Sequence, residues 1–119
     1  MIRGEIWWCD FGVPVGSEPG YKRPSLVIQN NKLNDTRLAT TIVLPITSNL
    51  MFKDIQGNVF LPSNISKLSK DSIILAHQII CVSKEVLIEK VSNLTNSGVI
   101  KSIEEELLFV LGMERKAIQ

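Results

Sequence analysis

The chain has 119 residues, of which 45% are hydrophobic and 21% charged, a composition that excludes a disordered protein. A chain of this length typically forms one hydrophobic core, so we expect a single domain over residues 1–119. Thirteen Lys and Arg residues against twelve Asp and Glu residues leave a net charge of +1. The protein as a whole therefore has no strong attraction for nucleic acid or an anionic membrane, and any polyanion must be bound by a local patch.

The first residues lack the basic and then apolar pattern of a signal peptide, and no apolar stretch approaches the roughly 20 residues that cross a bilayer. We expect a cytoplasmic protein that does not contact membranes. Cys9 and Cys81 are the only cysteines, and there is one histidine. These residues form neither a disulfide framework nor a metal site, so no cofactor is predicted and both cysteines are expected to be small buried hydrophobic residues.

The first part of the chain has the pattern of short β-strands. Residues 5–12, EIWWCDFG, alternate aromatic and aliphatic side chains and predict a strand that glycine closes. A loop over 12–21 follows, and PSLVIQ over 24–29 predicts a second strand whose first residue, Pro24, is tolerated at that position.

The middle of the chain continues this pattern. Residues 30–35 predict a turn with one helical turn, and residues 38–48 predict a longer third strand in which Pro45 marks an edge or a bulge. Three short segments follow: a loop over 51–57, a strand over 58–62 and a polar connection over 63–71.

The last third contains the most apolar segment and the only long helix. SIILAHQIICVS, residues 72–83, is hydrophobic on both faces and predicts one long central strand buried on each side. A last short strand is predicted over 90–94. Beyond Thr95, apolar residues fall at helical spacing, and Thr95 or Ser97 is the expected helix cap. Together these elements predict a mainly β fold, a small bent sheet or barrel with a C-terminal helix packed on one side.

Four segments carry a resemblance to a known family. RGEIWWCDFG, GSEPGYKRPSLVIQNN, VLPITSN and KDSIILAHQI occur in this order between residues 3 and 79. Their combination of an Arg-Pro opening the second strand, a Pro-x-Thr-Ser ending the third and a polar pair within a late apolar run resembles the MazF/PemK toxin endoribonucleases of bacterial toxin-antitoxin systems. The resemblance covers residue 3 to about residue 112.

The resemblance implies an SH3-like small barrel of the CcdB/MazF/PemK type, assembled as a homodimer. It implies sequence-selective cleavage of single-stranded RNA such as mRNA without a metal ion, leaving a 2′,3′-cyclic phosphate and a 5′-hydroxyl. It also implies that the toxin inhibits translation and is neutralised by a cognate antitoxin. One alternative is a CcdB-like protein of the same fold that binds and poisons a topoisomerase and cleaves nothing. Another is an inactive adaptor with the same barrel.

The same resemblance assigns site residues. By position, Arg23 matches the catalytic arginine of the family and Thr47 its catalytic threonine, while Ser48 and Gln78 lie where relatives line the RNA groove. Relatives often have Glu-Gln where this chain has His77-Gln78.

The residue types suit metal-free RNA cleavage, in which the 2′-hydroxyl attacks phosphorus and negative charge grows on the phosphate oxygens. An arginine fork binds those oxygens and stays charged, and a threonine hydroxyl donates to them without adding charge. Pro24 favours an extended backbone at Arg23 and so limits its freedom. The alternatives are that Arg23 pairs with a carboxylate such as Asp10 or Glu18, and that Thr47 and Ser48 only satisfy turn backbone.

Other side chains are candidates for contacts with RNA. Lys22, Lys53 and Arg37 are placed to follow the RNA backbone or are simply solvated, and Tyr21 and Phe52 are placed to stack on bases or to pack. His77 and Gln78 would face opposite sides of a strand, so only one can face a groove, and we expect Gln78 to do so. Trp7 and Trp8 face opposite ways for the same reason.

Overall fold

The computed structural model describes residues 1–17 and 20–113, and its secondary structure is mainly β. The strands are β1 (Glu5–Asp10), β2 (Lys22–Val27), β3 (Thr40–Thr47), β4 (Val59–Leu61), β5 (Ser72–Ile74), β6 (Ile80–Ser83) and β7 (Leu87–Asn93). The helices are α1 (Asn31–Asn34), α2 (Ser63–Ser66) and α3 (Val99–Val110), with short 3-10 turns η1 (Leu50–Asp54), η2 (Ala76–Gln78) and η3 (Lys84–Val86).

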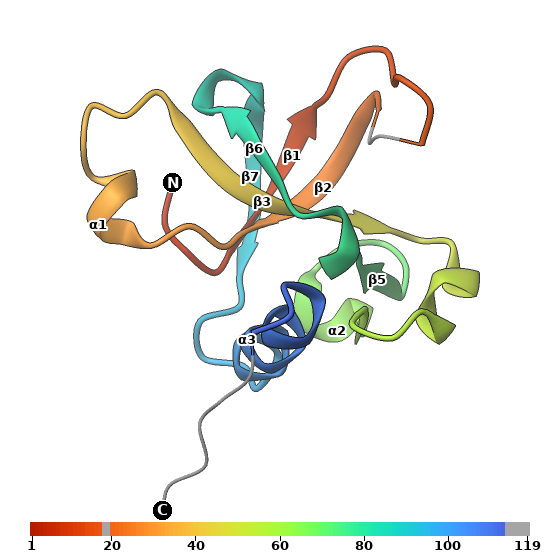
Figure 1. Cartoon of the computed structure of the whole chain (residues 1–119). Helices are drawn as coiled ribbons and strands as arrows, with labels where there is room; N and C mark the ends of the chain where they lie inside the picture. Colours follow the sequence, from red (N-terminus) through yellow and green to blue (C-terminus); the bar gives the residue numbers. More distant parts are fainter. Residues whose placement is uncertain (18–19, 114–119) are drawn as a thin grey trace, which may run out of the picture.

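The strands form one antiparallel sheet in the order β4-β5-β3-β2-β1-β7, and β6 pairs with the other half of β3. Figure 1 shows this sheet bending over α3, which lies below it and packs against η2 and β4. Over the described residues the two ends of the strand order do not pair, so the sheet stays open. The predicted fold class, a mainly β barrel-like domain with a C-terminal helix, is confirmed.

The core lies between the concave side of the sheet and α3. Alternate strand residues such as Ile6, Leu26 and Leu44 are fully buried there, and Ile103 of α3 is buried against them. Such side chains contribute most of the folding free energy, at about 25 cal/mol per Å² of buried apolar surface. None of the helices over residues 1–17 and 20–113 is long and apolar enough to span a bilayer.

The prediction of one long strand over 72–83 is wrong. β5 pairs with β3 up to Ile74 opposite Ile46, and β6 resumes the pairing at Ile80 opposite Val43. The five residues 75–79 therefore lie opposite only two residues of β3, 44 and 45. The extra residues leave the ladder and form the 3-10 turn η2. One of those two is Pro45, which has no N–H to donate to the ladder. The sheet is thus irregular at Pro45, as expected, but the extra residues belong to the segment that pairs with β3 and not to β3 itself.

Three smaller predictions are corrected in part. Cys9 is fully buried, but Cys81 on β6 is exposed, because β6 packs only one face against the molecule. Gly98 immediately precedes α3 with a helical backbone and has no side chain to cap it, but Ser97 Oγ accepts a hydrogen bond from the Val99 N–H at 3.4 Å. Of the two expected caps, Ser97 therefore supplies the capping oxygen and Thr95 does not. The second strand begins at Lys22, because Lys22 pairs with Asp10 and extends the β1–β2 ladder.

The buried carboxylate of Glu5 links the first strand, β1, to the edge strand β7. The Glu5 carboxylate is buried and accepts hydrogen bonds from the Ile2 N–H at 2.7 Å, the Trp7 indole at 3.1 Å and Lys90 Nζ at 2.9 Å. Burial alone would raise the pKa of Glu5 above 4.5, but the bonds from Lys90, Trp7 and Ile2 together outweigh it and lower the pKa.

We expect Glu5→Gln to destabilise the fold at pH 7 by about 1–3 kcal/mol, because it removes charged hydrogen bonds from a buried site. A lowered folded pKa means that this stabilisation is present above the unfolded pKa of Glu and disappears as the pH falls through the folded value. In urea unfolding, the difference in unfolding free energy between wild type and Glu5→Gln should therefore be smaller at pH 3 than at pH 7. Glu89→Gln, at an exposed neighbouring position, is the control; a difference independent of pH would contradict this role.

Candidate functional site

Arg23 is held in the β1–β2 ladder, where it lies opposite Cys9 while Pro24 lies opposite Trp8. Its Nε donates to the Gly20 carbonyl at 3.3 Å, which ties the side chain to the end of the preceding loop. Adding a Cβ at Gly20 would bring it within 2.5 Å of the Pro14 ring, so only glycine permits this loop closure. The Gly20 end of this loop thus helps to position the arginine.

The outer nitrogens of the Arg23 guanidinium make no hydrogen bond or ion pair with residues 1–17 or 20–113. The ion pairs over residues 1–17 and 20–113 join Arg3 to Glu104 and Lys90 to Glu5, and neither involves Arg23. Asp10, a suggested partner, instead accepts from the Gly12 N–H at 2.9 Å; the other suggested partner, Glu18, lies outside the described residues. A half-buried arginine without a carboxylate partner in this part of the chain is suited to an anion.

Thr47 lies beside Arg23 at the end of β3. Ser25 pairs with Pro45 in the β2–β3 ladder, so the same register carried two residues further places Arg23 opposite Thr47, on the same face. Thr47 Oγ1 accepts from the Asn49 N–H at 3.1 Å, which leaves its own hydrogen free to donate to a ligand. The expectation that Arg23 and Thr47 meet at one end of the sheet agrees with this geometry.

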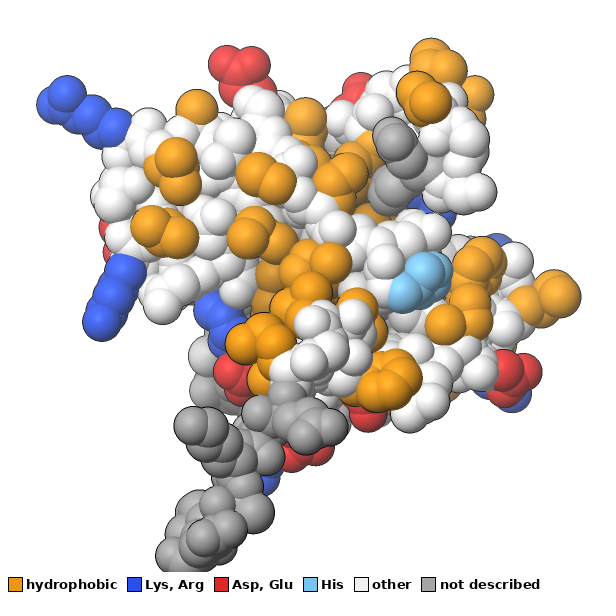
Figure 2. All heavy atoms as spheres, viewed as in Figure 1, with side chains coloured by type: hydrophobic (Ala, Val, Ile, Leu, Met, Phe, Trp, Pro, Cys, Tyr) orange, Lys and Arg blue, Asp and Glu red, His pale blue; other side chains and the backbone are white. Residues whose placement is uncertain are grey.

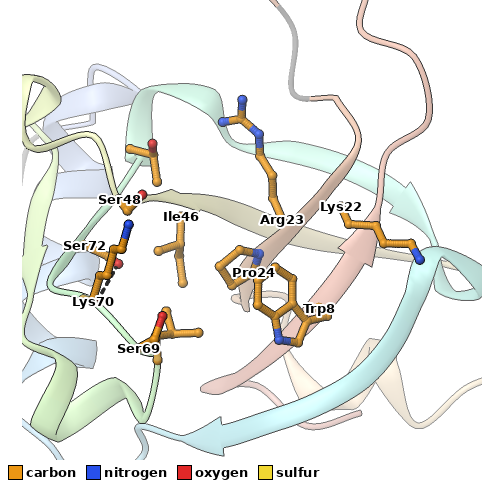
Figure 3. A pocket seen from close by; sticks show the side chains of 11 residues that line it. Trp8, Lys22, Arg23, Pro24, Ile46, Ser48, Ser69, Lys70 and Ser72 are labelled. Atoms are coloured by element: carbon orange, nitrogen blue, oxygen red, sulfur yellow. Dashed lines mark hydrogen bonds between the residues drawn. The ribbon is translucent and has the colours of Figure 1, made fainter.

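Two cavities meet at this pair, because both include Arg23 and Thr47 in their walls. The first cavity, of about 420 Å³, is shown in Figure 3: Trp8, Arg23 and Pro24 form one side, Ser48, Ser69, Lys70 and Ser72 the other, and Ile46 lies between. Lys22 also lines it, but Figure 3 shows its side chain directed away from the centre.

The second cavity, of about 630 Å³, contains aromatic and amide side chains and is lined on one side by the loop residues Pro14, Gly16, Ser17, Gly20 and Tyr21. The Phe52 and His77 rings stack with centroids 6.3 Å apart, and His77 Nδ1 lies 2.9 Å from Asn58 Oδ1. An amide oxygen only accepts, so Nδ1 carries the proton. Figure 2 shows this single imidazole exposed at the surface beside hydrophobic side chains.

Gln78 lines the same cavity, and its Oε1 is buried without a hydrogen-bond partner among the described residues. A buried unpaired acceptor costs about 1–3 kcal/mol, which a donor on a ligand would recover. The prediction that His77 and Gln78 face opposite sides is wrong, because they lie in the turn η2 and not in a strand, so alternation does not apply.

The remaining predicted residues divide between the two cavities and the outer surface. Ser48 lines the first cavity and Tyr21 the second, where Tyr21 has a left-handed backbone with φ 58° and a 65% exposed side chain. Lys53 on η1 lines neither cavity, and Arg37 lies in an exposed loop after α1. Over residues 1–17 and 20–113, no group of three His, Cys, Asp or Glu side chains is placed to hold a metal ion.

Lys70 and Trp8 are cavity residues that the sequence did not single out as site residues. Lys70 belongs to the polar connection before β5, where a lysine is usually only solvated, and Trp8 belongs to a strand rich in aromatic residues. No local pattern distinguishes them, because their proximity to Arg23 arises from contacts between segments more than ten residues apart in the chain.

The chain is similar in sequence to a known protein family and in fold to solved members of it. Residues 2–111 match the family described as the PemK-like, MazF-like toxin of type II toxin-antitoxin systems. A curated relative, endoribonuclease MazF2 of Mycobacterium bovis, is 42% identical over 97 residues, which cover 82% of this chain and 85% of the relative.

Solved structures show the same fold. MazF of Deinococcus radiodurans (Form-I) superimposes with a TM-score of 0.78 at 23% identity and covers 95% of this chain and 97% of its own. A MazE-MazF structure from the same organism (Form-II) superimposes with a TM-score of 0.75 at 23% identity, over 96% of this chain and 97% of that one.

Proposed function

The chain belongs to the PemK-like, MazF-like toxin family of type II toxin-antitoxin systems, and we propose that it is a sequence-selective endoribonuclease that cleaves single-stranded RNA and inhibits translation. Its curated relatives are endoribonucleases, which favours this activity over the CcdB-like alternative of a topoisomerase poison. We also propose that cleavage requires no metal ion and leaves a 2′,3′-cyclic phosphate and a 5′-hydroxyl.

In this proposal the scissile phosphate lies between the two cavities. The outer nitrogens of Arg23 bind its non-bridging oxygens, and the Thr47 hydroxyl donates to the same group. As the 2′-oxygen forms its bond to phosphorus and the 5′-oxygen leaves, charge grows on those oxygens, and donors already in place stabilise it. The 2′-hydroxyl proton is released and the 5′-oxygen takes up a proton. Ser48 and Gln78 contact the neighbouring nucleotides, with Lys22, Tyr21 and Lys53 at the outer edge of the groove.

The observation that carries this proposal is the shared position of Arg23 and Thr47. Both side chains line both cavities, so a strand of RNA passing from one cavity to the other would cross them. A protein that only bound another protein would not need, at that point, a free hydroxyl and an arginine without an ion pair in the described part of the chain.

The decisive experiment incubates the purified protein with a long single-stranded RNA in EDTA and sequences the ends of the fragments. We expect cuts at a recurrent short sequence, with ends that require removal of a cyclic phosphate before ligation. Intact RNA after incubation with folded protein would contradict the proposed activity, and cleavage that appeared only with added metal would contradict its metal independence.

His77 is expected to hold substrate and not to transfer a proton, because it lines only the second cavity, whereas Arg23 and Thr47 line both. A group that transfers a proton contributes about 10²- to 10⁴-fold to the rate. His77→Gln should therefore change kcat by less than about threefold and leave the pH profile of kcat unaltered. Single-turnover cleavage between pH 6 and 9 measures both, and loss of one limb of the profile would assign His77 to the chemistry.

The partners follow from the same proposal. We infer that the protein is cytoplasmic, folds as one domain over residues 1–119, forms a homodimer and is neutralised by a cognate antitoxin with an acidic segment. Exposed apolar side chains on and after α3, such as Phe109 and Leu111 at 52% each, support self-association. Sedimentation equilibrium measures it, and competition between RNA and an acidic antitoxin peptide tests the shared site.

A further inference from the structure

The first cavity differs from the rest of the molecule in charge. Although the chain has a net charge of only +1, Lys22, Arg23 and Lys70 line this cavity together with four hydroxyl side chains, and none of its lining residues in the described part of the chain is acidic. Three cations without a carboxylate in a half-enclosed space favour an anion. Arg23 and Thr47 lie at its border with the second cavity, and the Lys22 side chain is directed away from its centre (Figure 3). Lys70 is therefore the cation available inside this cavity to a second anionic group.

Lys70 is placed across the cavity from Arg23. Figure 3 shows its ammonium group near Ser48 and Ser72, on the wall opposite Arg23 and Trp8. Its backbone is fixed, because the Ser72 hydroxyl donates to the Lys70 carbonyl at 3.0 Å. The adjacent carboxylate of Asp71 accepts from the Ser63 N–H at 2.9 Å and forms no ion pair with Lys70. The lysine thus stands on an ordered segment without a neutralising partner in the described residues.

Trp8 supplies an apolar surface in the same cavity. Its side chain is 37% exposed and forms the wall below Arg23 and Pro24 in Figure 3. Stacking of an unpaired base on an aromatic side chain contributes about 1–3 kcal/mol. The cavity thus offers a cation for a phosphate, hydroxyls for polar contacts and an aromatic ring for a base, which are the parts of one nucleotide.

We propose that the first cavity binds the nucleotide next to the cut, with Lys70 holding the phosphate adjacent to the one that is cleaved and Trp8 contacting the base. This inference rests on the proposed endoribonuclease function and adds a binding site on one side of the scissile phosphate. The second cavity, where amide and aromatic side chains predominate, accommodates the RNA on the other side. Lys70 is a binding residue, so it affects affinity and not the chemical step.

The first test compares Lys70→Ala with wild type on a synthetic oligoribonucleotide that contains a cut site mapped in long RNA. Because one exposed phosphate contact is lost, KM should rise about 5- to 10-fold while kcat changes less than about twofold. A 2′-deoxy residue at the cut makes the same oligonucleotide uncleavable, so its binding can be measured at several salt concentrations. The slope of log K against log salt should be shallower for Lys70→Ala than for wild type by about 0.7. Lys101→Ala, on the exposed surface of α3, should change neither quantity, and an unchanged KM and slope for Lys70→Ala would overturn the proposal.

The second test removes the charge from the RNA. A methylphosphonate is placed at either phosphate flanking the cut, and wild type and Lys70→Ala are compared on each oligonucleotide. At one of the two positions the substitution should weaken wild-type binding by the same 5- to 10-fold and have almost no effect on Lys70→Ala, since the contact is already absent. Additive effects at both positions would overturn the proposal. Failure of wild type to cleave the unmodified RNA would refute the nuclease function itself, so the two results are distinguishable.

Discussion

Arg23→Ala is expected to lower kcat for RNA cleavage by about 10²- to 10³-fold, the effect of removing one preorganised donor from a site where charge develops. The structure gives the reason: the guanidinium is fixed through Nε to the Gly20 carbonyl, and its outer nitrogens make no ion pair within residues 1–17 and 20–113. Binding of an uncleavable RNA should weaken much less than kcat falls, because the charge on the phosphate grows only in the transition state. Single-turnover kinetics with saturating enzyme measure the effect.

Two further variants test whether the loss of rate comes from the bidentate geometry of Arg23, from its charge, or from the loss of any surface arginine. Arg23→Lys keeps the charge but cannot bind two phosphate oxygens at once, so it should recover only part of the rate. Arg37→Ala removes an exposed arginine that lines neither cavity and should cleave at the wild-type rate. If Arg23→Ala cut RNA as fast as wild type, the assignment of the phosphate site would be wrong.

Thr47→Val is expected to have the second largest effect, a fall in kcat of about 10- to 100-fold, since the lost donor is neutral and weaker than a charged one. Valine keeps the shape of threonine and its preference for a strand, so β3 should persist. It also removes the acceptor for the Asn49 N–H, and thermal unfolding should show a loss of about 1 kcal/mol from that bond.

Thr47→Ser is the matched control, because it keeps the hydroxyl for both the phosphate and the Asn49 N–H. It should cleave RNA within a few-fold of wild type. Equal losses in the valine and serine variants would show that the methyl group matters and the hydroxyl does not, which contradicts a donor role.

Much of the site was predictable from residues close together in the sequence. The family resemblance of the Arg-Pro and Pro-x-Thr-Ser motifs implied a phosphate site at Arg23 and Thr47, and the antiparallel register of β2 and β3 brings these residues to one face. The two residues lie side by side because β2 and β3 pair in an antiparallel register, while their role in cleavage stays a prediction. The sequence was less accurate for the start of β2, since pairing with β1 extends the strand to Lys22.

The segment over 72–83 shows where such rules fail. Its apolar composition predicted one strand, but its partner β3 contains Pro45, which cannot donate to the ladder, and the surplus residues fold out as η2. His77 and Gln78 therefore line one cavity together. A prediction from this segment alone had no access to the proline more than twenty-five residues away.

The amino-acid sequence by itself determined the family, the mainly β fold with its C-terminal helix, and Arg23 and Thr47 as site candidates, because these depend on periodicity and on motifs of a few residues. Only the tertiary structure decided that Cys81 is exposed, that η2 interrupts the apolar run, and that Lys70 faces Arg23 and Trp8 across a cavity without acidic side chains in its described wall. Those properties depend on which distant segments pair and pack, and long-range pairing is not encoded in the periodicity of any single segment.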